Sequence, residues 1–271
     1  MKRLLLWCLA LAASGQACAD ASLLEHIVGG FSRDSLWKNV QQRCLTPATP
    51  IHPDCVIVDR QRGFVLYKDM IGASHYLVIP VRPVSGVDDA RVWSDREHNA
   101  WAFGWSVRDT VARAVGNPLP DTLLGLAINA KAARSQDQLH IHLDCISESA
   151  RDFMASGAID TRWRDLQFRG KAVRARLIPS DDPVLPVDPF DVVRQDIGAD
   201  ADIADRGVFV GYVRPPQGQP GQAGFVVVDE PVSKAGGANG HASDFLDRGC
   251  KLGRARPQPQ SQSQSQPQPQ Q

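Results

Sequence analysis

The sequence predicts an α+β fold, in which a mostly antiparallel sheet carries flanking helices within one elaborated domain. Apolar and polar residues alternate strictly over 138–144, which is the period of a half-buried strand. The loops between neighbouring strand candidates are short, as antiparallel pairing permits. Residues 95–116 have the apolar spacing of a helix that packs one face on such a sheet.

The other strands are predicted from short runs of β-branched and aromatic residues between turn signals. We expect strands at 56–59, 63–68, 75–82, 123–129, 138–146, 172–178, 208–213 and 224–228. The last two should form a hairpin around a stretch rich in glycine and proline, 215–221. Further helices are expected at 149–158, 189–198, 244–252 and, weakened by a Gly29-Gly30 pair, at 22–42.

The helix predicted at 95–116 is the most regular in the chain. Its core stripe consists of Phe103, Val107, Val111 and Ala114. Trp101 and Trp105 lie with Arg108 on a neighbouring flank, where core packing is the expected role of the two indoles. Gly116 and Pro118 should end the helix.

Composition narrows the class of protein. The chain has 271 residues, of which 43% are hydrophobic and 22% charged, as in an ordinary soluble protein with a real core. The 30 basic and 30 acidic residues cancel. A nucleic-acid binder normally carries a basic footprint, so the sequence argues against a nucleic-acid partner. It identifies no protein partner.

The first nineteen residues have the pattern of a secretory signal peptide. Lys2 and Arg3 precede an apolar run at 4–13, and Ala17-Cys18-Ala19 supplies a small-x-small site with expected cleavage after Ala19. Retention of 1–19 as a membrane anchor is the rival interpretation. The folded domain is then expected over 20–253. Residues 254–271 should be a disordered tail, since they end in a run of only Pro, Gln and Ser.

Four cysteines remain after removal of that segment: Cys44, Cys55, Cys145 and Cys250. An even number in an exported chain predicts two disulfides, for which three connectivities are possible. Cys44 and Cys55 flank a proline-bearing loop whose ends a disulfide could join. A CxxC spacing is absent from the sequence, which gives a zinc cluster little support.

The candidate site is the polar face of the strand predicted at 138–146. On a strand, the side chains of Gln138, His140, His142 and Asp144 point to one face. Burying such a face without partners would be costly, so it is a site candidate. The preceding loop, 129–137, contributes further polar side chains, Lys131, Arg134, Ser135 and Gln136. Basic and amide groups beside histidines favour phosphoryl chemistry.

Three interpretations of the two histidines compete. They could simply form hydrogen bonds across a sheet. They could hold a divalent metal together with Asp144, although no second HxH or HxxE supplies the missing ligands. Finally, His140 could be a nucleophile that accepts a nucleotidyl group, because a neutral imidazole attacks phosphorus without prior deprotonation. The phosphate would then be held by the cations and amides of 129–137.

The block around His140 resembles the histidine triad superfamily, whose signature is His-x-His-x-His followed by two apolar residues. His140 takes the middle, nucleophilic place and His142 the last place. Asn129 corresponds to the upstream amide that opens the substrate loop, and 75–80 is similar to the family's first core strand. Gln138 occupies the first place, which is a departure. Its amide can donate to a phosphate oxygen but cannot act as an acid.

Over roughly 36–250 the chain resembles one branch more closely, the CDP-diacylglycerol pyrophosphatase family. The similar segments are the paired Cys44 and Cys55, 63–69, 101–109, 126–129, 134–136, 140–142 and Cys145. The resemblance implies hydrolysis of CDP-diacylglycerol to CMP and phosphatidate at a membrane surface, without metal or other cofactor. The signal-like segment 1–19 predicts export to the periplasm or the periplasmic face of the inner membrane.

The site roles follow from the same resemblance. His140 would form the CMP adduct, His142 would support it, and Gln138 would stabilise the transferring phosphoryl. Substrate would be held by Asn129, Lys131, Arg134, Ser135 and Gln136. Expected disulfides are Cys44–Cys55 and Cys145–Cys250, the second beside the site strand. A metal-dependent phosphohydrolase and a non-catalytic nucleotide- or lipid-binding protein stay open as alternatives.

Overall fold

The computed structural model describes residues 32–46, 51–95, 98–198, 201–218 and 221–254. The expected signal peptide at 1–19, the first ten residues of the helix expected at 22–42, and the tail from 255 lie outside the described residues. The bounds given below therefore concern the described part of the chain.

The described residues form a nine-stranded sheet in the order β1-β2-β3-β5-β4-β8-β9-β7-β6. Every neighbouring pair is antiparallel, which confirms the predicted α+β class with an antiparallel sheet. The strands are β1 Cys55–Asp59, β2 Phe64–Lys68, β3 Tyr76–Pro80, β4 Leu124–Ile128, β5 Ile141–Cys145, β6 Arg164–Phe168, β7 Lys171–Pro179, β8 Arg206–Val213 and β9 Gly224–Pro231.

Strand β6 is absent from the sequence-based expectation. Its burial alternates between half-buried and exposed positions at the edge of the sheet, so it has little of the apolar character that marks the other strands. Its turn into β7 passes through Arg169 and Gly170, both with positive φ. This is the geometry of a tight hairpin, and Gly170 is the residue that could have indicated it.

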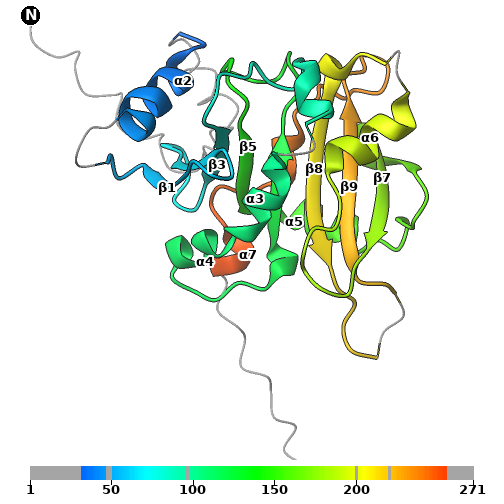
Figure 1. Cartoon of the computed structure of the whole chain (residues 1–271). Coiled ribbons are helices and arrows are strands. Elements are labelled where there is room, and N and C mark those ends of the chain that lie inside the picture. Colours follow the sequence, from blue (N-terminus) through cyan, green and yellow to red (C-terminus); the bar gives the residue numbers. More distant parts are fainter. Residues whose placement is uncertain (1–31, 47–50, 96–97, 199–200, 219–220, 255–271) are drawn as a thin grey trace, which may run out of the picture.

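The helices are short and flank the sheet (Figure 1). The α-helices are α2 Ser35–Val40, α3 Ala100–Ser106, α4 Asp109–Val115, α5 Glu148–Met154, α6 Pro189–Ile197 and α7 Lys251–Arg254. Single turns are η1 Gln41–Leu45, η2 Ala90–Trp93, η3 Asp121–Leu123, η4 Ile203–Asp205 and η5 Ala242–Phe245. Side-chain caps define the starts of the α-helices α3, α5 and α6, because Asn99, Ser147 and Asp188 each accept a hydrogen bond from a first-turn amide.

Two helix predictions are wrong in detail. The single helix expected at 95–116 is divided into α3 and α4 at Val107, and the Arg108 guanidinium donates to the Trp105 carbonyl there. The helix expected at 244–252 is instead the turn η5, a bridge residue at Leu246, a turn at 248–249 and the short α7. Cys250, at φ 47°, has a left-handed backbone that a continuous helix does not accommodate.

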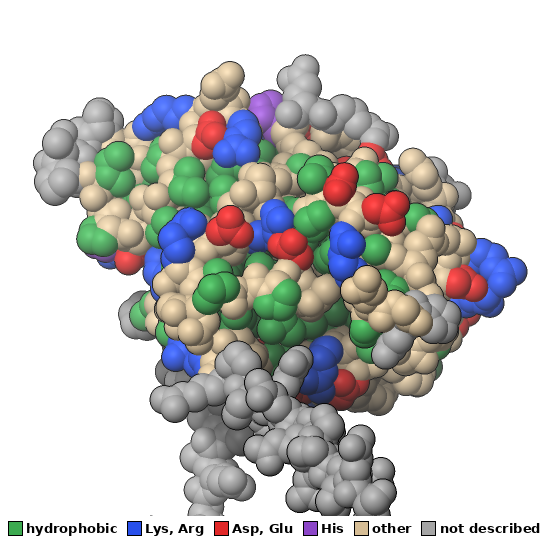
Figure 2. Space-filling view, turned by 90° about the horizontal axis from the view of Figure 1, so that it is seen from below, with side chains coloured by type: hydrophobic (Ala, Val, Ile, Leu, Met, Phe, Trp, Pro, Cys, Tyr) green, Lys and Arg blue, Asp and Glu red, His purple; other side chains and the backbone are tan. Residues whose placement is uncertain are grey.

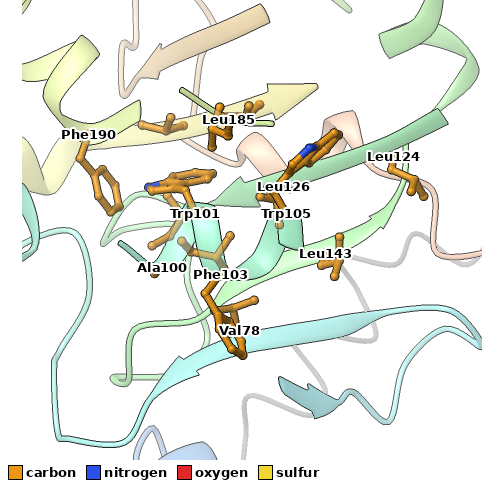
Figure 3. Packing of buried hydrophobic residues seen from close by; sticks show 14 of the residues in the cluster. Val78, Ala100, Trp101, Phe103, Trp105, Leu124, Leu126, Leu143, Leu185 and Phe190 are labelled. Carbon is orange, nitrogen blue, oxygen red and sulfur yellow. The ribbon is translucent and has the colours of Figure 1, made fainter. Parts of the chain in front are cut away.

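Apolar side chains cover the first face of the sheet, beneath α3, α4 and α6. Trp101 and Trp105 of α3 are 0% and 2% exposed and pack over Leu126 and Leu143, which confirms their expected core role (Figure 3). This large cluster anchors β5, because Ile141, Leu143 and Cys145 all belong to it. The alternate residues of β5 consequently face the opposite side.

The second face of the sheet carries two separate apolar clusters. The α2 cluster lies at one end and comprises Leu36, Val40, Cys44, Cys55, Val65, Tyr67, Leu77 and Ile79. The α5 cluster lies at the other and includes Ala127, Ile146, Ala150, Met154, Phe168, Phe209, Val226, Val228 and Phe245. In the sheet, His142 pairs with Leu77 of the first cluster and Ala127 of the second. The polar side of β5 therefore lies between them.

Both expected disulfides are present, Cys44–Cys55 and Cys145–Cys250, with Cα–Cα distances of 5.5 and 5.1 Å. Two disulfides are consistent with an exported protein. Among the described residues, no helix has the length and apolarity needed to cross a bilayer. On the face shown in Figure 2, basic and acidic side chains are interspersed with hydrophobic ones.

Candidate active site

The histidine face belongs to β5 and the residues just before it. The strand begins at Ile141, not at 138 as expected, so Gln138 and His140 lead into it. The rings of His140 and His142 still meet edge to face, with centroids 5.0 Å apart. This face is buried, since His140 and His142 are 7% and 3% exposed. Both faces of the strand are therefore buried, and not one face as a half-buried strand would have, because apolar clusters lie on both sides of the two histidines.

A third histidine, His75, lies against His142. The Nε2 atom of His75 is 2.9 Å from Nδ1 of His142, and the two rings stack with centroids 5.0 Å apart. Sequence reasoning placed His75 at the start of a strand but assigned it no role. The available signal was its register: Leu77 pairs with His142, and His75 precedes Leu77 by two residues on the same side of β3.

The loop before β3 orients His75. Its Nδ1 atom lies 3.1 Å from the Ile71 carbonyl oxygen and 3.4 Å from Oδ2 of Asp69. A carbonyl only accepts, so Nδ1 of His75 carries a hydrogen. In the neutral ring Nε2 then accepts from Nδ1–H of His142, whose own Nε2 is buried and has no hydrogen-bond partner among the described residues. Burial, with the neighbouring His140 and His75, places the pKa of His142 well below its usual value.

His140 has its tautomer fixed by the backbone. Its Nδ1 atom lies 2.6 Å from the carbonyl oxygen of Gln138. Because this oxygen can only accept, Nδ1 is the donor and the lone pair of the neutral ring resides on Nε2. That is the arrangement a nucleophilic imidazole requires.

Asp144 continues the same face into the interior. Its Oδ1 accepts from the Ser74 hydroxyl at 2.7 Å and from the Cys145 amide at 2.8 Å. Burial raises the pKa of Asp144 to about 7. Its Oδ2 has no hydrogen-bond partner among the described residues. Ser74 and His75 are adjacent, so one loop contacts both Asp144 and His142.

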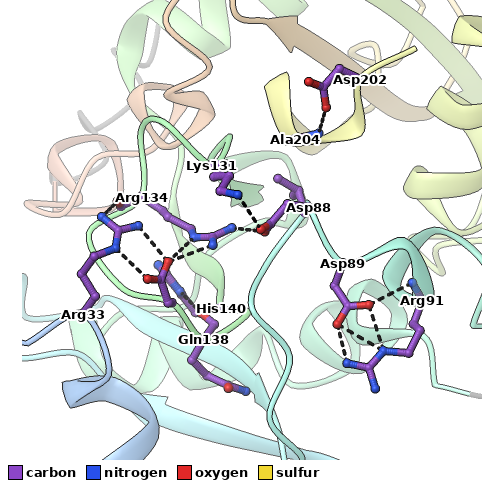
Figure 4. A network of polar contacts seen from close by, with 12 residues as sticks. Arg33, Asp88, Asp89, Arg91, Lys131, Arg134, Gln138, His140, Asp202 and Ala204 are labelled. Carbon is purple, nitrogen blue, oxygen red and sulfur yellow. Dashed lines mark hydrogen bonds and ion pairs between the residues drawn. The ribbon is translucent and has the colours of Figure 1, made fainter. Parts of the chain in front are cut away.

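The cations predicted to bind phosphate are paired with carboxylates (Figure 4). Arg134, whose side chain is 4% exposed, bridges Asp88 and Asp137, and Lys131 lies 3.3 Å from Asp88. Arg33, which sequence reasoning missed, also binds Asp137. The Arg33 hydrogen bond, supported by Arg134, lowers the pKa of Asp137 strongly. Arg134 is the buried cation of this network and needs counterions, which Asp88 and Asp137 supply.

The amide side chains near the histidines form hydrogen bonds with neighbouring segments of the protein. Gln138 donates to the Arg82 carbonyl and accepts from the Val84 amide. Gln136 accepts from the Leu36 amide at the start of α2. Asn129 makes two hydrogen bonds with Ser243 in η5.

Ser135 is part-buried in the same turn as Gln136, and its carbonyl accepts from the Gln136 side chain. Gln136 thus holds the start of α2 beside the loop 129–137, and Asn129 holds η5 there.

The C-terminal segment contributes two charged or titratable residues that sequence reasoning missed, His241 and Arg248. His241 Nδ1 lies 2.8 Å from Asp244, and both His241 and Arg248 act electrostatically on His142. The signal that could have found them is Cys250, because its disulfide to Cys145 fixes this segment beside β5.

Comparison with known proteins places this site in a family. The model of the CDP-diacylglycerol pyrophosphatase family matches residues 31–254, which is most of the chain. The chain belongs to this family. The match includes β5, the loop before β3 and the C-terminal segment, so every residue of the histidine site lies within the CDP-diacylglycerol pyrophosphatase region.

Individual CDP-diacylglycerol pyrophosphatases are similar over part of their length. The Yersinia pestis enzyme is 34% identical over 137 residues, which are 49% of this chain and 53% of that protein. A probable CDP-diacylglycerol pyrophosphatase of Mycobacterium leprae is 36% identical over 125 residues, 45% and 47% of the two chains. That of Mycobacterium tuberculosis is 32% identical over 161 residues, 55% and 61%. The chain spans about half the length of the curated relatives it matches.

The donor atoms on the face of β5 bear on the metal-binding alternative in this member of the CDP-diacylglycerol pyrophosphatase family. Within the described ranges, no three His, Cys, Asp or Glu side chains converge as ligands. Oδ1 of Asp144 is engaged by Ser74 and the Cys145 amide, and Nδ1 of His142 by His75. The other two atoms, Oδ2 of Asp144 and Nε2 of His142, have no hydrogen-bond partner among the described residues.

Proposed function

We propose that this chain hydrolyses CDP-diacylglycerol to CMP and phosphatidate through a nucleotidyl-histidine intermediate on His140. Membership of the CDP-diacylglycerol pyrophosphatase family supports the reaction. The single observation that carries the mechanism is the 2.6 Å contact between His140 Nδ1 and the Gln138 carbonyl, which leaves the Nε2 lone pair for attack.

In the first step, Nε2 of His140 attacks the phosphorus bonded to cytidine. The bond from that phosphorus to the bridging oxygen breaks, and phosphatidate leaves with the electron pair. The product is CMP joined to an imidazolium whose Nδ1–H still donates to Gln138. The carbonyl stabilises this positive ring and prevents it from turning.

The departure at Gln138 is compatible with this chemistry. Phosphatidate leaves as a phosphate monoester, whose second pKa is about 6, so it needs no proton at neutral pH. An acid at the first triad place is therefore dispensable for this substrate. Gln138 instead positions His140 through its own backbone carbonyl, while its side chain is held by Arg82 and Val84.

In the second step, water attacks the same phosphorus and the bond to His140 Nε2 breaks. The oxygen stays on CMP, and one proton must leave the water. His142 is neutral because burial lowers its pKa, and its Nε2 lone pair can take that proton before passing it to solvent. His75 holds His142 in the required tautomer.

The finer assignments belong to the same proposal. The sheet order β3-β5-β4 with a histidine strand at its centre supports a histidine-triad-like fold. The two disulfides, with the signal-like residues at 1–19, support location in the periplasm or at the periplasmic face of the inner membrane. The diacylglycerol part of the substrate would stay in the membrane surface while the cytidylyl group enters.

Product analysis tests this function. Purified mature protein is incubated with CDP-diacylglycerol in detergent, with and without excess chelator, and CMP and phosphatidate are quantified. We expect equimolar products at the same rate in both samples. Loss of activity with chelator, recovered by added metal, would support the metal-dependent alternative. Binding without turnover would identify a non-catalytic lipid- or nucleotide-binding protein.

A further inference from the structure

The loop between β2 and β3, residues 69–75, is held in a tight shape by its own contacts. The Lys68 ammonium donates to the carbonyls of Asp69 and Gly72, at 2.7 and 2.6 Å. The Ile71 amide donates to Oδ1 of Asp69 at 2.9 Å. A Cβ built on Gly72, at φ +87°, would lie 3.1 Å from the His75 Cβ, so this close approach requires glycine. The other carboxylate oxygen of Asp69, Oδ2, lies 3.4 Å from Nδ1 of His75.

These contacts continue the hydrogen bond between the two histidines toward the protein surface. Nδ1–H of His142 donates to Nε2 of His75 at 2.9 Å. Nδ1–H of His75 in turn faces the Ile71 carbonyl oxygen at 3.1 Å and the Asp69 carboxylate. The His75 side chain is 0% exposed, whereas that of Asp69 is 17% exposed. A chain of donors and acceptors therefore leads from the buried face of β5 to a carboxylate that solvent reaches.

His142 is a poor place for a positive charge. In the proposed second step its Nε2 takes a proton from water, which makes the ring an imidazolium. The ring is buried, its centroid lies 5.0 Å from that of His140, and burial with the neighbouring histidines keeps the pKa of His142 well below its usual value. Asp144, two residues along the same strand face, is a weak counterion, because burial disfavours its ionised form and raises its pKa to about 7.

We propose that His75 takes this proton from His142 and that Asp69 is the counterion of the imidazolium so formed. The inference rests on the proposed function for the reaction that supplies the proton. Water gives a proton to Nε2 of His142, and the proton on Nδ1 of His142 moves to Nε2 of His75. His142 is then neutral, and the His75 imidazolium lies against the Asp69 carboxylate and the Ile71 carbonyl. After CMP leaves, the transfer runs backward and His142 releases its Nε2 proton to water that enters the site.

Asp69 should therefore act on one of the two steps. Formation of the cytidylyl adduct expels phosphatidate without a proton transfer, whereas hydrolysis of the adduct removes one proton from water. Asp69→Asn keeps an oxygen that accepts from the Ile71 amide but removes the negative charge beside His75. We expect this variant to form the adduct as fast as the wild type and to hydrolyse it about 10- to 100-fold more slowly. The adduct should therefore accumulate during turnover.

Rapid-quench kinetics with excess CDP-diacylglycerol in detergent separate the two steps, because the adduct and free CMP are quantified at each time. Asp69→Glu restores the charge and should hydrolyse the adduct faster than Asp69→Asn. Asp54→Asn is the matched control, since its carboxylate binds Arg43 and Tyr67 while its carbonyl accepts from the Lys68 amide. It should match the wild type in both steps. The thermal midpoint checks the fold of each variant. If the Asn variant does not fold, Asp69→Ser replaces it, because a serine hydroxyl also accepts from a nearby amide.

Adduct hydrolysis at the wild-type rate in folded Asp69→Asn would overturn the inference, as would an equal loss of rate in both steps, which would indicate a structural role. In either case a wild type that forms the adduct and releases CMP leaves the proposed function in place. A wild type that releases no CMP would contradict the proposed function and the inference with it.

Discussion

His75 and His142 form a stacked, hydrogen-bonded pair that joins β3 to β5, with 2.9 Å between Nε2 of His75 and Nδ1 of His142. The pair fixes one ring nitrogen of His142 and directs the other along the face shared with His140. Asp69 and the Ile71 carbonyl contact the other ring nitrogen of His75, Nδ1. The chemistry proposed for His140 therefore depends on a loop that precedes it by about seventy residues in the chain.

Substitution of His75 should affect turnover more than substrate binding. In His75→Ala, His142 loses its Nδ1 partner and its fixed tautomer, so we expect kcat to fall about 10- to 100-fold with KM nearly unchanged. Steady-state kinetics with CDP-diacylglycerol measure both constants. His52→Ala, at a half-exposed histidine outside the site, is the control. A rise in KM at constant kcat would instead place His75 in substrate binding.

Asp144 should make the stability of the protein pH-dependent. In the folded chain the Asp144 carboxyl keeps its proton up to about pH 7. In the unfolded chain the same carboxyl has its ordinary pKa of 3.8 and loses its proton above that pH. This stabilisation is complete below pH 3.8 and is lost as pH rises toward 7, at about 1.4 kcal/mol per pH unit. Asp144→Asn cannot ionise and should lack that slope.

Urea denaturation of the wild type and Asp144→Asn at pH 5, 6 and 7 measures the difference. The opposite contribution of His142, whose lowered pKa destabilises the folded state in acid, is common to both proteins and cancels. We expect the free energy of unfolding of Asp144→Asn, relative to that of the wild type, to increase from pH 5 to 6 and again from pH 6 to 7. Parallel curves would show that Asp144 is already ionised at pH 5.

The two cations of the 129–137 loop should differ in their effect. Arg134 is nearly buried between two carboxylates, so Arg134→Ala should lower the free energy of unfolding by about 3 kcal/mol. Lys131, with a side chain 57% exposed, should change it by less than about 1 kcal/mol. Urea denaturation of both variants measures this. A stable Arg134→Ala protein with a strongly raised KM would restore the direct phosphate contact expected from the sequence.

The two disulfides should matter for activity to different degrees. Cys145–Cys250 fixes the segment that carries Arg248, whereas Cys44–Cys55 joins the end of η1 to the edge strand β1. The double variant Cys145→Ser/Cys250→Ser should lose about 10-fold or more in kcat/KM, because Cys145 lies on β5 three residues from His142 and its bridge holds that strand in place. Cys44→Ser/Cys55→Ser should chiefly lose stability. Equal losses of kcat/KM at equal folded fraction would contradict this assignment.

The sequence was sufficient for features that depend on local pattern. Alternation in 138–144 located the histidine face, and apolar runs located eight of the nine strands of the described sheet. Both disulfide pairs followed from family resemblance. The division of the helix at Val107 could not be read from periodicity, because an arginine side chain competes there for a helix carbonyl.

Of the site residues that sequence reasoning missed, Arg33 binds Asp137, whereas the others act on His142 through the tertiary structure. His75 is placed by strand register, while His241 and Arg248 are placed by the disulfide and the β-bridge to Ile146. Conversely, Lys131 and Arg134 appear near His140 in sequence, but their counterion Asp88 comes from a separate loop. Residue type and spacing indicated the chemistry, whereas the partners of each charge required the fold.

Trapping of the intermediate tests the central claim most directly. Wild-type protein and His140→Gln are mixed with CDP-diacylglycerol, quenched during turnover under conditions that preserve phosphoramidates, digested and examined by mass spectrometry. The account predicts an added cytidylyl mass on the wild-type peptide that contains His140, localised to that residue by fragmentation, and neither adduct nor turnover in folded His140→Gln. An adduct on His142 or His75, or turnover by His140→Gln, would contradict it.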